Sequence, residues 1–359
     1  MPEPTSGAAR VASAHGPRTA GLEVARALAL LGLMAADAFH VVPGTDSSAL
    51  GPMSAGDCFA VTFAVVAGTS LALATGGRRL LECRHCASVR ADLAVQAVLI
   101  AMIGFALGFA HNVPVVLSYY GVLCLLTMVL LGRPPWLLAS FAGWVLLVAP
   151  IFVTWTSGHT DARLDGSPSF PMLVTDPSRL LGNLFLTGYY PVLLYLAYAC
   201  AGLAIGRMDL SSVRLTCKLL AGGAATIAVS WMMWWLAGQA SRSRAWVETV
   251  RGITGLGFAV VVVMAALLLV RTPLLERPLR SFRDAGTMAL TLYSAHVLIL
   301  GTGVLGISPD EQCAVLLIGA LLFAVLWRRI LADGPLEWLI AQCSCRARHA
   351  LMASRGEPQ

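Results

Sequence analysis

Charged residues are scarce in this chain: only 12% of its 359 residues are Asp, Glu, Lys or Arg, whereas 57% are hydrophobic. The mean hydropathy of +0.76 lies far above the range of soluble globular domains. Several apolar runs reach the roughly 20 residues that a helix needs to cross about 30 Å of hydrocarbon. These features exclude a soluble single-core protein and predict a multi-pass protein of the cell membrane, with the lipid bilayer as a partner.

The sequence also lacks the alternating ten-residue pattern of membrane-spanning strands, which argues against a β-barrel. Unpaired backbone groups are costly in lipid, so we expect an all-α transmembrane bundle. About ten spans are predicted, at residues 22–42, 56–75, 91–110, 115–131, 136–156, 190–206, 216–237, 253–270, 287–306 and 311–331.

Lysine is nearly absent, because Lys218 is the only one and all other basic residues except histidine are arginines. In a membrane protein such a basic excess marks cytoplasmic loops, so the net charge of +6 does not indicate nucleic-acid binding. With a cytoplasmic N-terminus, four arginine-rich segments fall on the inner side: 78–90, 207–218, 271–283 and 328–348. Both termini are therefore expected in the cytoplasm. Only the arginines of 241–251 fall on the outer side, which leaves the boundary between the seventh and eighth helices open.

Three parts are expected along the chain. Residues 1–20 are polar and small, lack the apolar core of a signal peptide, and are predicted to form a disordered cytoplasmic tail. Residues 21–340 form the transmembrane domain, and 341–359 a cytoplasmic C-terminal tail. The long outer loop at 157–189 is expected to fold partly as a surface helix, with a plain connector as the alternative.

Cysteine usage does not indicate a disulfide framework, because most of the nine cysteines lie in predicted spans or on the reduced cytoplasmic side. The motifs CRHC at 83–86 and CSC at 343–345 are candidates to share a zinc ion, but the second spacing is wrong for a zinc knuckle. No metal is therefore expected.

The first predicted helix carries ionisable residues in the run RALALLGLMAADAFH, residues 26–40. Arg26 and Asp37 are separated by about three helical turns, so they share one side of the helix with His40 and Glu23. A charge that faces lipid near the membrane centre costs at least ~3 kcal/mol, so this stripe should face the bundle interior. The alternatives are that Arg26 is a cytoplasmic anchor or a partner of Glu23, and that Asp37 and His40 lie at a wet outer rim.

Three further residues are site candidates. Asp57 opens the second predicted helix near the depth of Asp37 and His40, so the three side chains are candidates to converge; otherwise Asp57 caps its helix. Tyr293 and His296 lie three residues apart on one face of a later helix, about halfway across the membrane. An ionisable residue at that depth is a functional candidate, and a buried histidine satisfied by a neighbouring hydroxyl is the alternative.

The pattern resembles the catalytic membrane domain of heparan-alpha-glucosaminide N-acetyltransferase and its bacterial relatives, within the transmembrane acyltransferase group. In that family an Arg opens helix one and an Asn follows eleven residues later; here Arg26 and Asp37 hold those places. The other matching positions are Asp57, Phe63, Gly68 and Ser70 in helix two, Gly286, Tyr293 and His296 in helix nine, and the segments 188–207 and 334–339. The resemblance covers most of residues 20–340.

This resemblance implies transfer of an acetyl group from cytoplasmic acetyl-CoA, as co-substrate, to a sugar or other small acceptor at the outer face. The family's catalytic His lies about ten residues before the Asp of helix two, whereas residues 45–57 contain no histidine here. His40 is the candidate to replace it as the base, with Asp37 or Asp57 as the carboxylate that orients it.

The remaining roles follow from the needs of acyl transfer. His296 and Tyr293 are expected to bind the thioester or stabilise its oxyanion, and Arg26 to meet the CoA phosphates. The alternatives are a transporter or lipid-handling protein on the same scaffold, without acyl transfer, and a relative that has lost catalysis. The oligomeric state, including a homodimer, is left open.

Overall fold

The computed structural model describes residues 17–40, 55–77, 83–109, 113–157, 167–237 and 243–354, and within these ranges the regular structure is entirely helical. The helices in chain order are α2 (Pro17–His40), α3 (Ala55–Ala74), α4 (Cys83–Leu107), α5 (Val116–Val129), α6 (Pro135–Ser157), α7 (Phe170–Thr175), α8 (Pro177–Gly182), the π-helix η2 (Asn183–Thr187), α9 (Val192–Gly206), α10 (Val213–Leu236), α11 (Arg244–Leu269), the 3-10 helix η4 (Pro273–Leu275), α12 (Glu276–Thr287), α13 (Ala289–Thr302), α14 (Pro309–Ile330) and α15 (Pro335–Ser354). The predicted all-α class is confirmed.

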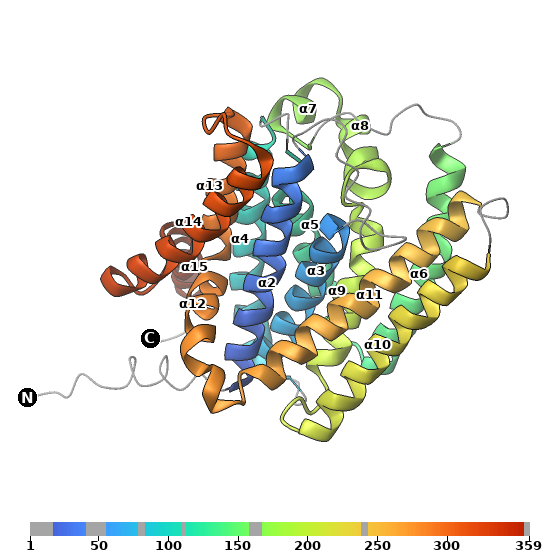
Figure 1. Ribbon diagram of the computed structural model, residues 1–359. Helices are drawn as coiled ribbons and strands as arrows, with labels where there is room; N and C mark the ends of the chain where they lie inside the picture. Colours follow the sequence, from blue (N-terminus) through green and yellow to red (C-terminus); the bar gives the residue numbers. More distant parts are fainter. Residues whose placement is uncertain are drawn as a thin grey trace, which may run out of the picture.

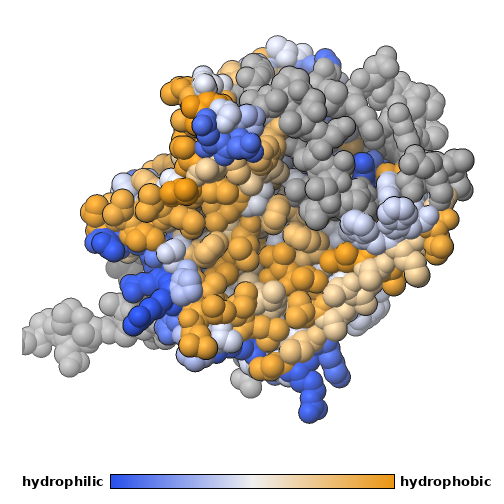
Figure 2. Space-filling model, in the orientation of Figure 1, coloured by the Kyte–Doolittle hydropathy of each residue, from blue (hydrophilic) through white to orange (hydrophobic). Residues whose placement is uncertain are grey.

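The lengths of the helices fit a polytopic membrane bundle. In the described part, six helices are long and apolar enough to cross a membrane, or eight if each of two bent helix pairs is one span. These eight correspond to eight of the ten predicted spans. The other two predicted spans correspond to α2, which carries the ionisable residues, and α5, which has 14 residues. Figure 2 shows hydrophobic side chains across the middle of one face and hydrophilic ones gathered toward its lower and upper ends.

Helix α2 runs through the centre of the bundle, between α3 and α11 on one side and α12, α13 and α14 on the other (Figure 1). Its residues Val24, Ala25, Ala27 and Leu30 have no exposed surface. Asp37 of the same helix is also buried, and Arg26 is half-buried, so both side chains lie against protein, where the cost of a charge in hydrocarbon is smallest.

Small residues let α3 and α9 pack closely. A Cβ added at Gly68 would lie 2.0 Å from the carbonyl oxygen of Ala199, so only glycine fits this contact. Beside it, the Thr69 hydroxyl donates to the carbonyl of Gly202 at 3.1 Å. Close backbone approach and interhelical hydrogen bonds of this kind hold membrane helices together, where lipid offers no hydrophobic driving force.

Loops rich in arginine meet at one end of the bundle. Arg271, just after α11, donates to the carbonyls of Leu210 and Ser211 in the α9–α10 loop. Arg18 at the start of α2 pairs with Asp209 of the same loop, with 3.3 Å between Nη2 and Oδ1. This end, where the predicted inner segments 207–218 and 271–283 come together, is called the arginine end below.

A sharp bend separates α12 from α13. The two helices, taken with η4, meet at 74°. Glu337 of α15 lies at this bend: its Oε1 accepts hydrogen bonds from the backbone N–H groups of Leu290 at 2.8 Å and Thr291 at 3.0 Å, and its Oε2 accepts from the Thr291 hydroxyl. A carboxylate at a helix N-terminus satisfies free N–H groups and favours the helix dipole. Glu337 therefore caps α13 from another helix.

Three helix ends differ from the sequence-based boundaries. Helix α2 begins at Pro17, inside the predicted tail, because proline is favourable in the first helical turn. Helix α15, which was not among the predicted spans, extends to Ser354 and so includes most of the segment predicted as the C-terminal tail. Helix α11 begins at Arg244 rather than near 253, since the Ser243 hydroxyl caps it by accepting from Trp246 N at 3.3 Å.

The predicted outer loop is partly helical, as α7, α8 and η2. Asp176 caps α8, accepting from the backbone N–H of Arg179 at 3.0 Å and from the Ser178 hydroxyl at 2.7 Å. These hydrogen bonds hold the pKa of the Asp176 carboxyl below its ordinary value.

Candidate functional site

Arg26 faces a cavity instead of pairing with Glu23. Glu23 binds Arg283 of α12, with 3.3 Å between Glu23 Oε2 and Arg283 Nε. Arg26 donates to the Ser70 hydroxyl of α3 at 3.0 Å and has no carboxylate partner among the described residues. A guanidinium held inside a membrane bundle without a counter-charge is costly, so the site favours an anionic ligand.

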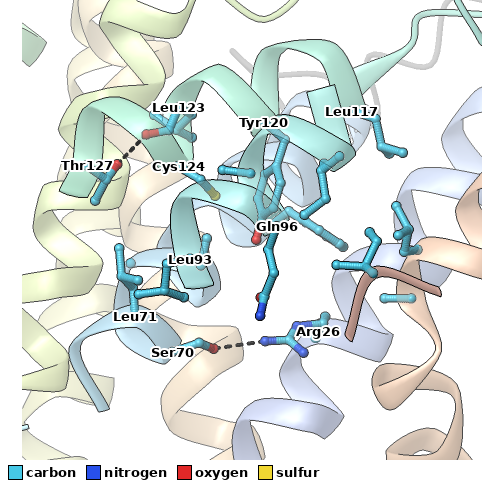
Figure 3. Close-up of a pocket in the computed structure, with 18 of the residues that line it drawn as sticks. Arg26, Ser70, Leu71, Leu93, Gln96, Leu117, Tyr120, Leu123, Cys124 and Thr127 are labelled. Carbon is cyan, nitrogen blue, oxygen red and sulfur yellow. Dashed lines mark hydrogen bonds between the residues drawn. The ribbon is translucent and has the colours of Figure 1, made fainter. Parts of the chain in front are cut away.

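The cavity beside Arg26 has a volume of about 380 Å³ and lies between α2, α3, α4, α5, α13 and α15. Apolar side chains such as Leu93, Leu117 and Leu123 make most of its wall (Figure 3). Among the described lining residues, Arg26 is the only basic one, and Tyr293 also belongs to the wall. The wall also contains the Glu337 carboxylate, whose oxygens accept hydrogen bonds from the start of α13. The cavity therefore combines apolar walls with one cation, Arg26, and one carboxylate that is already bound to the backbone.

Two polar groups in this cavity have no hydrogen-bond partner within the described part of the chain. The Gln96 side chain extends from α4 toward Arg26, and Tyr120 of α5 lies beside it (Figure 3). The ring of Tyr120 packs edge-on against Phe63, with 5.3 Å between ring centroids. Both residues are half-buried and line the cavity, so the Gln96 amide and Tyr120 hydroxyl are available to a ligand that carries amide or hydroxyl groups.

Tyr293 lines the cavity, and its ring packs against that of His296, which does not line it. The Tyr293 hydroxyl accepts a hydrogen bond from Val116 N at 2.8 Å and donates to the carbonyl of Pro114 at 3.1 Å. The hydroxyl proton is thus committed to the backbone before α5, so Tyr293 offers the cavity its ring. Its expected role as an oxyanion donor has no free proton in this arrangement.

His296 and Asp37 form a buried pair behind Tyr293. His296 Nε2 lies 3.1 Å from Asp37 Oδ2, and the two residues are only 1% and 4% exposed. His296 Nδ1 lies 2.9 Å from the carbonyl oxygen of Tyr293, which can only accept, so Nδ1 carries a proton. The close contact of Nε2 with Oδ2 requires a second proton between them. The pair therefore holds one proton more than a neutral histidine and a carboxylate, and it is neutral as a whole.

The structure thus places Asp37 with His296, residues that are 259 positions apart. His40 ends α2 one turn beyond Asp37, but its side chain lies outside the described part of the structure. Asp57 opens α3, as expected, and lines a second cavity with Glu248 and Arg251. Tyr190 interacts electrostatically with both Asp37 and Asp57.

Sequence reasoning missed Gln96 and Glu337 as site residues. Gln96 is a single amide in an apolar helix. Placing an amide in an apolar environment costs free energy, and this cost is the signal in the sequence that could have identified Gln96. Glu337 stands in the segment 334–339 that carries part of the resemblance, but its role depends on the bend before α13. In the described part of the chain, no group of three or more His, Cys, Asp or Glu side chains could hold a metal ion.

Several of the positions that carry the resemblance meet in space, whereas Asp57 lines the second cavity. Arg26 binds Ser70, Asp37 binds His296, and Gly286 packs against the backbone of Glu23, where a Cβ would lie 1.9 Å from the carbonyl oxygen. Each of these contacts joins two helices that are distant in the sequence. They lie at the cavity and at the buried Asp37–His296 pair.

Residues 204–346 match the family described as Protein of unknown function (DUF418). The matched region is less than half of the chain and extends from the end of α9 into α15, so it contains Tyr293, His296 and Glu337 but not Arg26, Asp37 or Asp57. No curated protein and no solved structure matches the chain. The similarity to this family therefore covers one side of the cavity and assigns it no chemistry.

Proposed function

We propose that the protein is an integral membrane acyltransferase that moves an acetyl group from cytoplasmic acetyl-CoA to a small acceptor at the outer face. The supporting observation is the position of Arg26, whose guanidinium has no carboxylate partner in the described part of the chain. It lines a cavity that also reaches Tyr293, and the Asp37–His296 pair lies behind that tyrosine. The arrangement of motif positions agrees with the resemblance to the heparan-alpha-glucosaminide N-acetyltransferase family.

In this proposal the arginine end of the bundle faces the cytoplasm, and Arg26 binds a phosphate of CoA. Guanidinium groups bind phosphate through two parallel charge-assisted hydrogen bonds. The pantetheine arm, which carries two amides, lies in the cavity, where Gln96 and Tyr120 supply partners for them. The thioester then lies at the Tyr293 end.

The chemistry requires one proton to leave the acceptor and one to reach the CoA sulfur. The acceptor nitrogen or oxygen forms a bond to the thioester carbon, and the carbon–sulfur bond breaks. His40 takes the acceptor's proton as general base. The Asp37–His296 pair, which holds an extra proton, delivers one to the departing thiolate when α13 moves enough to expose Nε2, and recovers it from His40.

The first test is acetyl-CoA binding to detergent-solubilised protein by isothermal titration calorimetry. Arg26→Gln should weaken binding about tenfold or more, because a hydrogen bond to a charged group contributes roughly 1.5–3 kcal/mol. The matched control is Arg283→Gln, which removes another arginine at the same end but outside the cavity lining. Equal losses in the two variants would refute the assignment of Arg26.

The second test is release of free CoA from acetyl-CoA in the presence of acceptor mixtures, measured as thiol. His296→Gln and His40→Ala should each slow release at least tenfold, in the range that general acid–base groups contribute. Release that survives both substitutions would contradict the proposed roles.

The apolar walls of the cavity also suit a lipid-handling protein without acyl transfer. Such a protein would bind a lipid phosphate at Arg26 and place its hydrocarbon chains against Leu93, Leu117 and Leu123. Saturable binding of a short-chain phosphatidic acid that depends on Arg26, without acetyl-CoA binding, would favour this alternative.

A further inference from the structure

Helix α12 is strongly charged, whereas α13, which follows it, is apolar. Five of the twelve residues of α12 are charged, and α13 contains no Asp, Glu, Lys or Arg. Taken with η4, α12 meets α13 at 74°, so the two helices do not both cross the membrane along its normal. Because charged side chains avoid hydrocarbon, α12 belongs at the membrane surface, at the arginine end of the bundle.

The two sides of α12 have different surroundings. On its apolar side, Phe282 packs against the core of the bundle. On its polar side, Arg283 binds Glu23 of α2, as described above. Asp284 binds Arg328 of α14, with 3.3 Å between Asp284 Oδ1 and Arg328 Nε. These contacts fix α12 to two neighbouring helices and determine which of its side chains face away from the bundle.

The remaining basic residues of α12 are exposed. Arg277 and Arg280 lie one turn apart on its polar side, and neither has a hydrogen-bond or ion-pair partner in the described part of the chain. Glu276, which is also exposed, is the acidic residue beside them. Leu274 of η4, two residues before α12, is 92% exposed. A leucine with this exposure beside arginines is typical of a segment that lies at the boundary between lipid headgroups and acyl chains.

A second exposed basic pair lies at the start of α10, at the same end of the bundle. Arg214 and Lys218 are one turn apart, and neither has an acidic partner among the residues that the structure describes. Arg271 connects the two places, because it lies just before η4 and donates to the carbonyls of Leu210 and Ser211, just before α10. Figure 2 shows hydrophilic side chains around α12 and at the lower end near the start of α10. The four exposed basic side chains are called the basic surface below: Arg214, Lys218, Arg277 and Arg280.

We propose that the basic surface binds the phosphate headgroups of anionic phospholipids in the adjacent membrane leaflet. Its four basic side chains outnumber Glu276, so the surface is net positive. Each Lys or Arg at an anionic membrane surface raises affinity about fivefold. An anionic phospholipid supplies phosphate for the basic groups and acyl chains for Leu274, whereas a soluble phosphate supplies only the first. This binding does not depend on acyl transfer.

The experiment measures lipid binding to the full-length protein in a non-ionic detergent by native mass spectrometry. It compares dioleoyl phosphatidylglycerol with dioleoyl phosphatidylcholine, which has the same acyl chains and no net charge. The wild-type protein should bind phosphatidylglycerol about tenfold or more tightly than phosphatidylcholine. The double variant Arg277→Gln with Arg280→Gln should lower phosphatidylglycerol affinity about tenfold or more, and so should Arg214→Gln with Lys218→Gln.

Two single variants are the controls. Arg179→Gln removes an exposed arginine of α8, in the predicted outer segment, and should leave phosphatidylglycerol affinity unchanged. Arg26→Gln removes the cation of the first cavity and should also leave it unchanged, because Arg26 lies outside the basic surface.

Equal affinity of the wild-type protein for the two lipids would overturn the proposal. A phosphatidylglycerol preference that survives both double variants would overturn its placement on α10 and α12, and a loss confined to Arg26→Gln would assign the lipid phosphate to the cavity. An equal loss in Arg179→Gln would show a general effect of charge and refute this surface. Displacement of phosphatidylglycerol by glycerol phosphate at equal concentration would show that the surface binds soluble phosphate rather than lipid.

Discussion

Replacing Asp37 by asparagine should cost little stability, although the residue is buried beside a histidine. Nδ1 of His296 donates to the Tyr293 carbonyl. In a neutral imidazole the other nitrogen, Nε2, is then an acceptor, so it needs a hydrogen-bond donor at the position of Asp37 Oδ2, 3.1 Å away. The Asn side chain supplies this donor through its amide N–H to a neutral His296. One hydrogen bond replaces another without burying a charge, so the free energy of unfolding should fall by no more than about 1 kcal/mol. The family that the sequence resembles has Asn at this place, which agrees with this expectation.

Asp37→Ala is the informative comparison. It removes the donor and leaves Nε2 unsatisfied at a side chain that is 1% exposed, which costs about 1–3 kcal/mol, plus the cavity left by the carboxyl group. His296→Ala leaves a buried carboxyl without its partner and should cost about 3–5 kcal/mol if that group stays charged.

The assay is thermal unfolding of the three variants in one detergent, with the wild-type protein as reference. The expected order of stability is wild type, then Asp37→Asn, then Asp37→Ala and His296→Ala. If Asp37→Asn unfolds at the same temperature as Asp37→Ala, the shared proton lies on His296 and the pair is held by charge, which would refute a neutral hydrogen bond between His296 and Asp37.

Three further predictions concern the scaffold, each measured by the same unfolding assay. Glu337→Ala should lower stability by about 1–2 kcal/mol, because the first N–H groups of α13 lose their acceptor; an unchanged midpoint would show that water replaces the cap. Gly68→Ala should destabilise the α3–α9 contact, whereas Gly143→Ala, which meets nothing within 4 Å in α6, should be neutral or slightly stabilising; similar effects of both would contradict the close packing. Glu23→Gln should cost less than about 1 kcal/mol, since its pair with Arg283 is partly exposed; a larger loss would show that this ion pair orders α12.

The bundle could be predicted because its signal is local. Each apolar run of about 20 residues predicts one helix without reference to the rest of the chain. The ionisable residues that share one side of α2 follow from helical periodicity alone. The inward direction of Arg26 and Asp37 also follows, because a lipid-facing charge is costly.

The partners of these residues could not be predicted, because pairing depends on tertiary structure. Asp37 and His296 lie on helices that begin and end far apart in the sequence, and the alternatives for Asp37 included His40 and Asp57. At the 74° bend before α13, α12 packs against α2 and Glu337 accepts hydrogen bonds from the start of α13, and neither contact leaves a periodic signal in the sequence.

The cavities were also invisible in the sequence. Their walls come from several helices that are far apart in the sequence, and a polar member such as Gln96 looks like an ordinary residue of an apolar helix. It is marked only by the lack of a hydrogen-bond partner among the described residues.

The most direct measurement of the proposed function is a structure of the protein in lipid nanodiscs with a non-hydrolysable acetyl-CoA analogue. We predict density for the pantetheine arm between Arg26 and Tyr293, and a phosphate oxygen within about 4 Å of the Arg26 guanidinium. A cavity filled by lipid, with the analogue absent or bound elsewhere, would contradict the assignment of this cavity to the acyl donor.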